Sequence, residues 1–294
     1  MSRLAEISTG SPLREGSVEV DGVVAPIWEA GPADSSEAIV FVHGLPGSGK
    51  EFSHLLPALG GVFRTLAFDL PGFGQAEKPA DFDYSSYGFA DFIEGALGAL
   101  GIARVHLATH DFGGGWALEW AIRHTSSVES VLMINTGLLG EEMHWLPKVW
   151  RTRVIGELAQ AVARIPLTRM LLWHGNPRGL PKWFVDGMYE NYDRGTRRAV
   201  LQMYRRIEKP KPMVDRLAEV LTPLDLPSLL LWGVHDPYIP VECAERARLL
   251  FPSTEISYFR ESGHWPFIDD PERAQREMVE FFSARAAAGG GERG

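Results

Sequence analysis

Short apolar runs without polar alternation recur along most of this chain and constrain its fold more than any other feature. Strands that are apolar on both faces are typical of a parallel sheet that is covered on both sides. Longer segments with helical periodicity separate these runs, so strands and helices alternate, as in a doubly wound α/β fold. The predicted strands are residues 39–43, 65–69, 105–110, 131–135 and 229–232, and the predicted helices are residues 87–100, 114–123, 241–250 and 271–284.

Turn signals mark both ends of this pattern. Residues 17–21 and 23–29 are two predicted strands joined through Asp21–Gly22, which is typical of a β-hairpin. The last helix begins at Asp270–Pro271, where we expect Asp270 as the N-cap and Pro271 as the first helical residue. Residues 286–294 are rich in Ala and Gly and predict a flexible tail.

Residues 138–224 interrupt the alternation. They are helical in pattern, rich in Trp, Arg and Tyr, and broken by Asn176–Pro177 and Leu180–Pro181. We interpret this segment as an α-helical cap (lid) inserted between two strands of the sheet. The α/β core then comprises residues 1–137 and 225–285.

The charge balance and the single cysteine disfavour several classes of function. Asp and Glu exceed Lys and Arg by 38 to 29, a formal net charge of −9, which disfavours nucleic acids and anionic membranes as partners. Cys243 is the only cysteine, so no intrachain disulfide can form, and the cytoplasm is the expected location. Residues 1–16 lack the apolar core of a signal peptide, and the longest apolar runs are too short to span a membrane.

A strand–turn–helix sequence places a carboxylate where a catalytic nucleophile is expected. The strand at residues 105–110 runs into Asp111–Phe112–Gly113–Gly114–Gly115, after which a helix begins. A nucleophile elbow has the pattern G-x-S-x-G, and residues 109–113 fit it with Asp111 in place of the Ser. A carboxylate is already anionic at neutral pH and can attack an sp³ carbon, forming a covalent ester.

Two further residues follow in the chain order nucleophile, acid, histidine. Asp236 follows the strand at residues 229–232, and His264 follows a predicted strand at residues 255–259. Ligands of open α/β sheets bind outside the carboxyl ends of the strands, where all three side chains are expected. We predict that His264 activates water against the ester and that Asp236 orients His264 and stabilises its cation.

Hydrolysis of such an ester passes through a tetrahedral anion, which requires an oxyanion hole. The strand at residues 39–43 leads into Gly44–Leu45–Pro46–Gly47, and the amide of Leu45 is one predicted donor. The amide of Phe112, directly after the nucleophile, is the other. Losing one such donor typically costs about 10²–10³ in rate.

The motifs that carry a family resemblance are His43–Gly44–Leu45–Pro46, Asp69–Leu70–Pro71–Gly72–Phe73–Gly74, Asp111, Asp236 and Gly263–His264. Together they resemble the epoxide hydrolase and haloalkane dehalogenase branch of the α/β-hydrolase superfamily. The resemblance runs over residues 18–282. It implies an α/β-hydrolase fold with an eight-stranded, mostly parallel sheet, an aspartate nucleophile and no cofactor.

Within this branch, the positions that bind a departing halide favour an epoxide hydrolase. Similar haloalkane dehalogenases place Trp after the nucleophile and often Asn or Trp after His–Gly, whereas this chain has Phe112 and Leu45, which lack side-chain donors. Fluoroacetate dehalogenases carry Arg after the nucleophile, which also differs. Epoxide hydrolases use lid tyrosines that hydrogen-bond the ring oxygen. Residues 195–205 resemble the helix that carries one of them, with Tyr204 as the proton donor.

The resemblance also implies a second lid donor. No Tyr occurs between Tyr87 and Tyr189, so we expect His144, Trp145 or Trp150 to take its place. These three residues and His43 are the predicted substrate-binding residues. The many Trp and Tyr residues of the insertion predict a small-molecule substrate that is apolar or aromatic.

Alternative functions remain open. A haloalkane dehalogenase would use the same triad, and a non-hydrolytic binding or cyclase-like protein would share the fold. Residues 44–50 fit the start of a nucleotide-binding P-loop, but Glu51 replaces the Ser or Thr that coordinates Mg²⁺. The histidines at 43, 106, 110 and 235 lack metal-ligand spacing, so we expect no metal.

Overall fold

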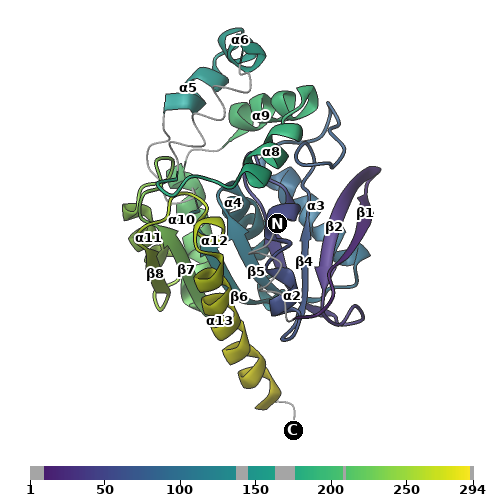
Figure 1. Cartoon of the computed structure of the whole chain (residues 1–294), viewed down its shortest axis with the longest axis vertical. Helices are drawn as coiled ribbons and strands as arrows, with labels where there is room; N and C mark the ends of the chain where they lie inside the picture. Colours follow the sequence, from purple (N-terminus) through teal and green to yellow (C-terminus); the bar gives the residue numbers. More distant parts are fainter. Residues whose placement is uncertain (1–9, 137–144, 163–175, 208–209, 292–294) are drawn as a thin grey trace.

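The predicted α/β architecture is confirmed by an eight-stranded sheet (Figure 1). In a computed structural model, which describes residues 10–136, 145–162, 176–207 and 210–291, the strand order is β1-β2-β4-β3-β5-β6-β7-β8. Strand β2 is antiparallel to both of its neighbours, β1 and β4, and all pairs among β3 to β8 are parallel. The strands are β1 (Arg14–Val20), β2 (Val23–Ala30), β3 (Glu37–Val42), β4 (Arg64–Phe68), β5 (Arg104–His110), β6 (Val128–Ile134), β7 (Ser228–Gly233) and β8 (Glu255–Phe259).

The predicted hairpin joins β1 to β2. Val20 pairs with Val23, and the two residues between them have positive φ angles, 48° at Asp21 and 79° at Gly22. A two-residue turn of this kind matches the twist of the flanking strands, and Asp–Gly is among its preferred sequences.

Helices cover both faces of the sheet, which explains why the inner strands β3 to β7 are buried on both faces. Val40 and Val42 point into a core cluster shared with α3 and α4, whereas Ile39 and Phe41 point into a second cluster shared with α2 and α13. The core helices are α2 (Leu56–Leu59), α3 (Ser86–Ala99), α4 (Phe112–Ala121), α10 (Pro210–Leu221), α11 (Glu242–Arg246), α12 (Pro266–Asp269) and α13 (Pro271–Gly291).

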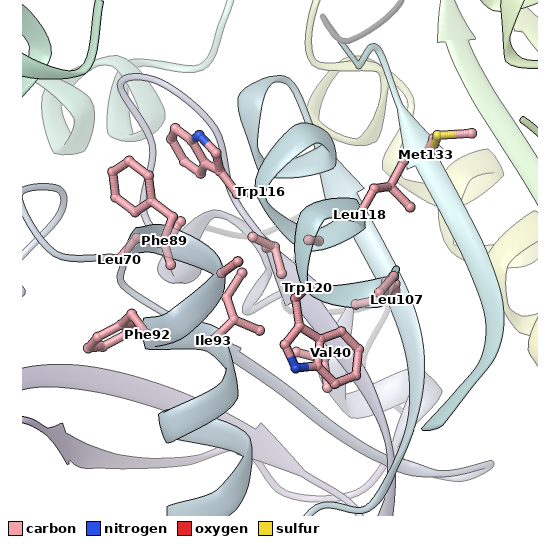
Figure 2. Packing of buried hydrophobic residues seen from close by; sticks show 14 of the residues in the cluster. Val40, Leu70, Phe89, Phe92, Ile93, Leu107, Trp116, Leu118, Trp120 and Met133 are labelled. Atoms are coloured by element: carbon pink, nitrogen blue, oxygen red, sulfur yellow. The ribbon is translucent and has the colours of Figure 1, made fainter. Parts of the chain in front are cut away.

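The first cluster holds α4 against the centre of the sheet (Figure 2). Phe89 of α3 stacks on Trp116 of α4 at a ring-centroid distance of 4.1 Å. Leu107 of β5 and Val40 of β3 form the sheet side of the same cluster. Each large apolar side chain buried in this way contributes about 1.5–3 kcal/mol. The helix that follows the predicted nucleophile is therefore fixed by its packing.

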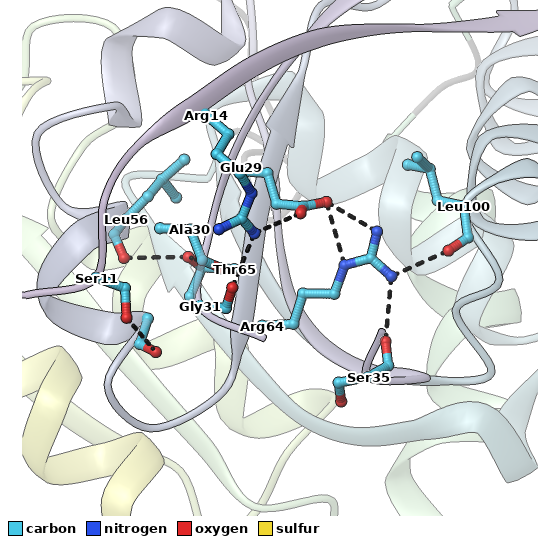
Figure 3. A network of polar contacts seen from close by, with 11 residues as sticks. Ser11, Arg14, Glu29, Ala30, Gly31, Ser35, Leu56, Arg64, Thr65 and Leu100 are labelled. Atoms are coloured by element: carbon cyan, nitrogen blue, oxygen red, sulfur yellow. Dashed lines mark hydrogen bonds and ion pairs between the residues drawn. The ribbon is translucent and has the colours of Figure 1, made fainter. Parts of the chain in front are cut away.

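A network of polar contacts links β1, β2 and β4 at the edge of the core (Figure 3). The buried carboxylate of Glu29 accepts from Arg64 Nη2 at 2.8 Å and Nε at 3.2 Å, and from Arg14 at 2.6 Å. Arg64 also donates to the carbonyl oxygens of Ser35 and Leu100 at 3.1 and 3.0 Å. Such a buried pair is tolerated because its remaining donors are satisfied.

Helices α5 (Trp145–Arg151), α6 (Ile155–Val162), α8 (Lys182–Glu190) and α9 (Arg194–Arg206) lie at the top of the molecule in Figure 1. We call these four helices the helical insertion. The predicted cap also included α10, but α10 packs on the core: Leu217 lies in the first core cluster, and Arg216 pairs with buried Glu119 of α4 at 2.5 Å. The predicted cap boundary at residue 224 stays a prediction, and the pairing of α10 with α4 favours an earlier one. The predicted boundary at residue 137 lies outside the described residues.

The last helix differs from its prediction at one end only. Asp270 caps α13 as expected, because its carboxylate accepts from the Arg273 amide at 3.4 Å. The predicted flexible tail from residue 286 is wrong up to Gly291, since α13 continues to that residue and projects from the body (Figure 1). Ala has the highest helix propensity, so a run of Ala extends a helix that the core has already started. No helix within the described ranges combines the length and apolar character of a membrane span.

Candidate active site

Asp111 occupies a sharp turn between β5 and α4. Its backbone has φ 51° and ψ −126°, outside the regions that a non-glycine residue normally adopts. A residue held in this way costs about 1–3 kcal/mol, which the packing of α4 must offset. The side chain is 6% exposed. This geometry matches the nucleophile elbow that the sequence predicts.

Two glycines of the sequence motifs are required by close approach. A Cβ added at Gly44 would lie 2.4 Å from the Cβ of Asp111, and one at Gly113 would lie 2.3 Å from the carbonyl oxygen of Val42. Both distances are well below van der Waals contact. Glycine at these positions lets the loop after β3 and the first turn of α4 converge on Asp111.

The Leu45 amide donates a hydrogen bond to Asp111 Oδ2 at 2.8 Å. Burial raises the pKa of Asp111, while the charge of His264 and the amides of Leu45 and Phe112 lower it in opposition. The predicted oxyanion-hole donors thus both stabilise the charged carboxylate. The Leu45 amide thus uses Oδ2, the oxygen opposite Oδ1.

His264 and Asp236 form the predicted pair. His264 Nδ1 donates to Asp236 Oδ2 at 2.7 Å, and both side chains are almost fully buried. Asp236 Oδ1 accepts from the amides of Tyr238 and Ile239 at 2.7 and 3.0 Å. A carboxylate held by these donors fixes the ring orientation of His264. Nδ1 is bonded to Asp236, so Nε2 is the nitrogen that can exchange a proton with another group.

Asn135 completes this arrangement and was not found from the sequence. It follows β6 with φ 37°, donates to Asp236 Oδ2 at 2.7 Å, and accepts from the Gly233 amide at 2.8 Å. Asn is the residue type that best tolerates a positive φ. Its place at the carboxyl end of a predicted strand was the signal that could have identified it.

The pKa of His264 depends on both acidic residues. Burial lowers it, but the charge and hydrogen bond of Asp236 and the charge of Asp111 together raise it above the ordinary value. An ester on Asp111 would remove one of these charges. The pKa of His264 would then fall, so more of the ring would be in the neutral form that can accept a proton from water.

Tyr204 lies on α9 beside the elbow. It is 2% exposed, its ring meets Phe112 edge to face at 5.6 Å, and it lies 4.8 Å from Trp150 of α5. Burial and the charge of Asp111 raise its pKa well above the ordinary value, so it is a neutral donor at neutral pH. Among the described residues its hydroxyl has no hydrogen-bond partner.

Helix α9 is fastened to the core near Tyr204. Asp193 caps its first turn by accepting from the Thr196 amide at 2.8 Å, and it pairs with Lys78 of the core at 3.0 Å. Arg198 donates to the carbonyl oxygen of Lys78 at 2.5 Å. These contacts fix the position of Tyr204 relative to Asp111.

The structure describes the other predicted substrate-binding residues to different extents. His144 lies outside the described residues, and Trp145 begins α5 but its side chain is not described. Trp150 is half-buried against Tyr204. Tyr238, which was not predicted, places its ring edge-on to His264 at 5.2 Å. Its pKa is raised by burial and by the charges of Asp236 and Asp111, so it too faces the site.

His43, a predicted substrate-binding residue, has both ring nitrogens bonded to the backbone. Its Nδ1 donates to the carbonyl oxygen of Gly44 at 2.8 Å, and its Nε2 accepts from the Leu70 amide at 2.9 Å. Burial lowers its pKa, which keeps the ring neutral. Both ring nitrogens are therefore used to join the loops after β3 and β4.

No group of three or more His, Cys, Asp or Glu side chains in the described part of the chain could hold a metal ion. The described part of the site brings together the carboxylate of Asp111, the imidazole of His264 and the hydroxyl of Tyr204.

Comparisons with known proteins identify the fold family. A family model described as the alpha/beta hydrolase fold matches residues 37–271. A 2-hydroxymuconate semialdehyde hydrolase from Pseudomonas putida is 31% identical over 232 residues, which cover 76% of this chain and 78% of the relative. A cis-3-alkyl-4-alkyloxetan-2-one decarboxylase from Xanthomonas campestris is 24% identical over 277 residues, 85% of this chain and 89% of the relative.

Solved structures repeat the same fold. A haloalkane dehalogenase loop variant from Bradyrhizobium elkanii superposes with a TM-score of 0.79 at 22% identity, covering 96% of this chain and 100% of its own. An epoxide hydrolase superposes with a TM-score of 0.78 at 20% identity, covering 93% and 99%. At these identities the likeness concerns the fold alone.

Proposed function

The chain belongs to the α/β-hydrolase fold family, and from that premise we propose that it opens an epoxide to a vicinal diol through a covalent ester on Asp111. The observation that carries the proposal is a carboxylate on the nucleophile elbow with a buried, unbonded tyrosine hydroxyl on the helix that packs against the next residue. A hydroxyl nucleophile would need a base to activate it, whereas Asp111 can attack directly.

In the first step, Asp111 Oδ1 attacks the less hindered ring carbon while the carbon–oxygen bond of the ring breaks. The ring oxygen takes a proton from Tyr204, giving a hydroxyalkyl ester and a phenolate. An alkoxide is far more basic than a phenolate, so Tyr204 can supply this proton even with its raised pKa. General acid catalysis of this kind contributes about 10²–10⁴-fold.

In the second step, water attacks the ester carbonyl carbon of Asp111. His264 takes the proton of this water, and Asp236 stabilises the resulting imidazolium. The developing oxyanion forms on Oδ2, which already accepts from the Leu45 amide at 2.8 Å. The bond between the carbonyl carbon and Oδ1 then breaks, and Oδ1 leaves with the diol after taking the proton held by His264. Asp111 is regenerated as a carboxylate, and the second proton of the water restores Tyr204.

A haloalkane is a weaker candidate substrate. The side chains of Leu45 and Phe112 carry no donor, and Phe112 uses its ring to contact Tyr204 at 5.6 Å. A halide leaving at these positions would lack the two side-chain hydrogen bonds that similar dehalogenases use.

A second candidate substrate is a strained four-membered lactone. The Xanthomonas campestris relative that aligns with 85% of this chain is named for acting on an alkyl-substituted oxetan-2-one. Attack of Asp111 on the sp³ ring carbon that bears the oxygen would form an ester and release a carboxylate instead of an alkoxide. That leaving group would need no proton from Tyr204.

The test is intact-protein mass spectrometry of His264→Gln, incubated with epoxides, haloalkanes and a cis-dialkyl oxetan-2-one. We expect an adduct with the full mass of an epoxide, because the ester forms but cannot be hydrolysed. The exposed neighbour His235→Gln is the matched control and should turn over without accumulating an adduct. The double variant Asp111→Asn/His264→Gln should form no adduct.

Other results of this experiment would support other functions. An alkyl adduct that lacks the halogen would favour the dehalogenase, and a full-mass lactone adduct would favour the second candidate. Full turnover by His264→Gln would contradict the two-step mechanism. Equal biological activity of wild type and Asp111→Ala would favour a non-hydrolytic binding or cyclase-like role.

A further inference from the structure

A cavity of about 470 Å³ lies between the core and the helical insertion, separate from the catalytic residues. Its floor is the turn after β3 together with η1 (Gly49–Phe52), and its roof is α8. Asp111, Asp236, His264 and Tyr204 do not line it. Its volume is in the range of sites that hold small molecules.

The floor of this cavity contains a carboxyl group without a partner. Glu51 is 6% exposed, and its Oε2 is fully buried with no hydrogen bond. The neighbouring carboxylate of Asp69 is satisfied, because it accepts from the Ser48 hydroxyl at 2.7 Å and from the amides of Gly49 and Gln75 at 2.8 and 2.7 Å. No cation among the described residues pairs with Glu51. A buried polar group left in this state is costly unless something else binds it.

The walls around Glu51 determine what can bind. Phe184 and Met188 of α8 are buried and apolar, and Trp183 is half-exposed at the rim. Burial and the charge of Asp69 raise the pKa of Glu51 well above its ordinary value. Burial also lowers the pKa of His54, on the same floor, to about 4. Burial thus disfavours a charge on both Glu51 and His54, and the space above them is largely apolar.

We propose that this cavity is a second small-molecule site that binds uncharged alcohols with an apolar or aromatic body, with their hydroxyl on Glu51. A hydroxyl both donates and accepts, so it can pair with the carboxyl group of Glu51 in either protonation state. The apolar body lies between Phe184 and Met188. This site goes beyond the proposed reaction and does not depend on it.

Anions are excluded by the same residues. Gly47, Ser48 and Lys50 give this floor the sequence of a P-loop, but the Ser48 hydroxyl already donates to Asp69. Asp186 and Glu190 of α8 also line the cavity, whereas Lys50 is the single Lys or Arg among its described lining residues. A phosphate or carboxylate ligand would therefore meet more acidic than basic side chains.

The experiment measures binding of 2-phenylethanol, with no turnover, through ¹³C-labelled methionine methyls. The Met188 methyl, assigned with Met188→Leu, reports on the cavity, and the Met203 methyl on α9 reports on the region of Tyr204. We expect a saturable shift at Met188. Ethylbenzene lacks the hydroxyl and phenylacetate is anionic, so each should bind at least about tenfold more weakly.

Variants of Glu51 separate hydrogen bonding from charge. Glu51→Gln keeps a neutral hydrogen-bonding group and should bind 2-phenylethanol within about threefold of wild type, whereas Glu51→Leu should lose at least about tenfold. Gly187→Trp fills the roof from a helical position at which an added Cβ meets nothing within 4 Å, and it should abolish binding. This variant decides the question if Glu51→Leu fails to fold.

Several results would overturn the proposal. They are the absence of a Met188 shift up to the solubility limit, wild-type affinity in Glu51→Leu or Gly187→Trp, and equal affinity for phenylacetate. Loss of binding in Tyr204→Phe alone, with a shift at Met203 only, would place the alcohol in the catalytic site instead.

Discussion

Replacing Tyr204 by Phe removes one hydroxyl and keeps the ring that packs against Phe112 and Trp150 at 5.6 and 4.8 Å. That hydroxyl has no hydrogen-bond partner among the described residues, so its loss should change the free energy of unfolding by less than about 0.5 kcal/mol. If the hydroxyl protonates the ring oxygen, ring opening should slow by about 10²–10⁴-fold. This loss corresponds to about 2.7–5.4 kcal/mol of transition-state stabilisation.

Tyr192→Phe is the matched control, since it removes a hydroxyl at the start of the same helix region. Tyr192 donates to Gln160 Oε1 at 2.9 Å, and Gln160 Nε2 is already buried without a partner. Its loss should therefore destabilise the protein by about 1–3 kcal/mol and leave the rate nearly unchanged. The two variants should thus show opposite effects on stability and rate.

The assays are urea denaturation for the free energy of unfolding and diol formation from the epoxide that gives an adduct with His264→Gln. A Tyr204→Phe rate within about threefold of wild type would show that Tyr204 is not the acid, because the expected loss is about 10²–10⁴-fold. A loss of more than about 1 kcal/mol of stability in Tyr204→Phe would show that the hydroxyl has a structural partner.

Three further predictions concern residues around the site. Asn135→Ala should lower the rate of ester hydrolysis by about tenfold, because Asp236 loses a donor at 2.7 Å, and single-turnover kinetics should show ester formation unchanged. Asp236→Asn should move the pH at which ester hydrolysis accelerates to lower values, since the charge that raises the pKa of His264 is gone; a pH–rate profile with an unmoved inflection would contradict this. Glu51→Gln should stabilise the protein at neutral pH, because the raised pKa of Glu51 means that the folded state holds a proton that the unfolded state releases, so stability falls as pH rises above 4.5, the ordinary value of this group. The stability gain measured by urea denaturation should vanish as the pH falls to that ordinary value.

Local signals were sufficient to predict most of the fold. The Asp21–Gly22 turn, the strand preceding Asp111 and the cap at Asp270 are each determined by a few neighbouring residues, and each is present. The placement of the triad also follows from chain order, because parallel strands bring their carboxyl ends to one edge. His264 and Asp236 meet there at 2.7 Å although 28 residues separate them.

Features that depend on tertiary contacts could not be predicted. Helix α10 has the amphipathic pattern of the insertion, and its contacts with the core, such as the pairing of Arg216 with buried Glu119, are visible only in the structure. His43 resembles a site residue in sequence because it precedes Gly44, yet its ring nitrogens serve the backbone. Glu51 was interpreted only as a mismatch to a P-loop, since its burial is invisible without the structure.

The two hydrogen bonds of His43 join the loops after β3 and β4 into one structural unit. The ring accepts from Leu70, and Asp69, next to it, accepts from Ser48 and Gly49 of the preceding loop. The position of the Leu45 amide on Asp111 therefore depends on Asp69 and Leu70, which lie in a different loop. A designer who transplants the Gly44–Leu45 loop into another hydrolase should transfer the Asp69–Gly74 loop with it. Grafting either loop alone would leave His43 or Asp69 bonded to the wrong backbone, and the oxyanion donor would be misaligned.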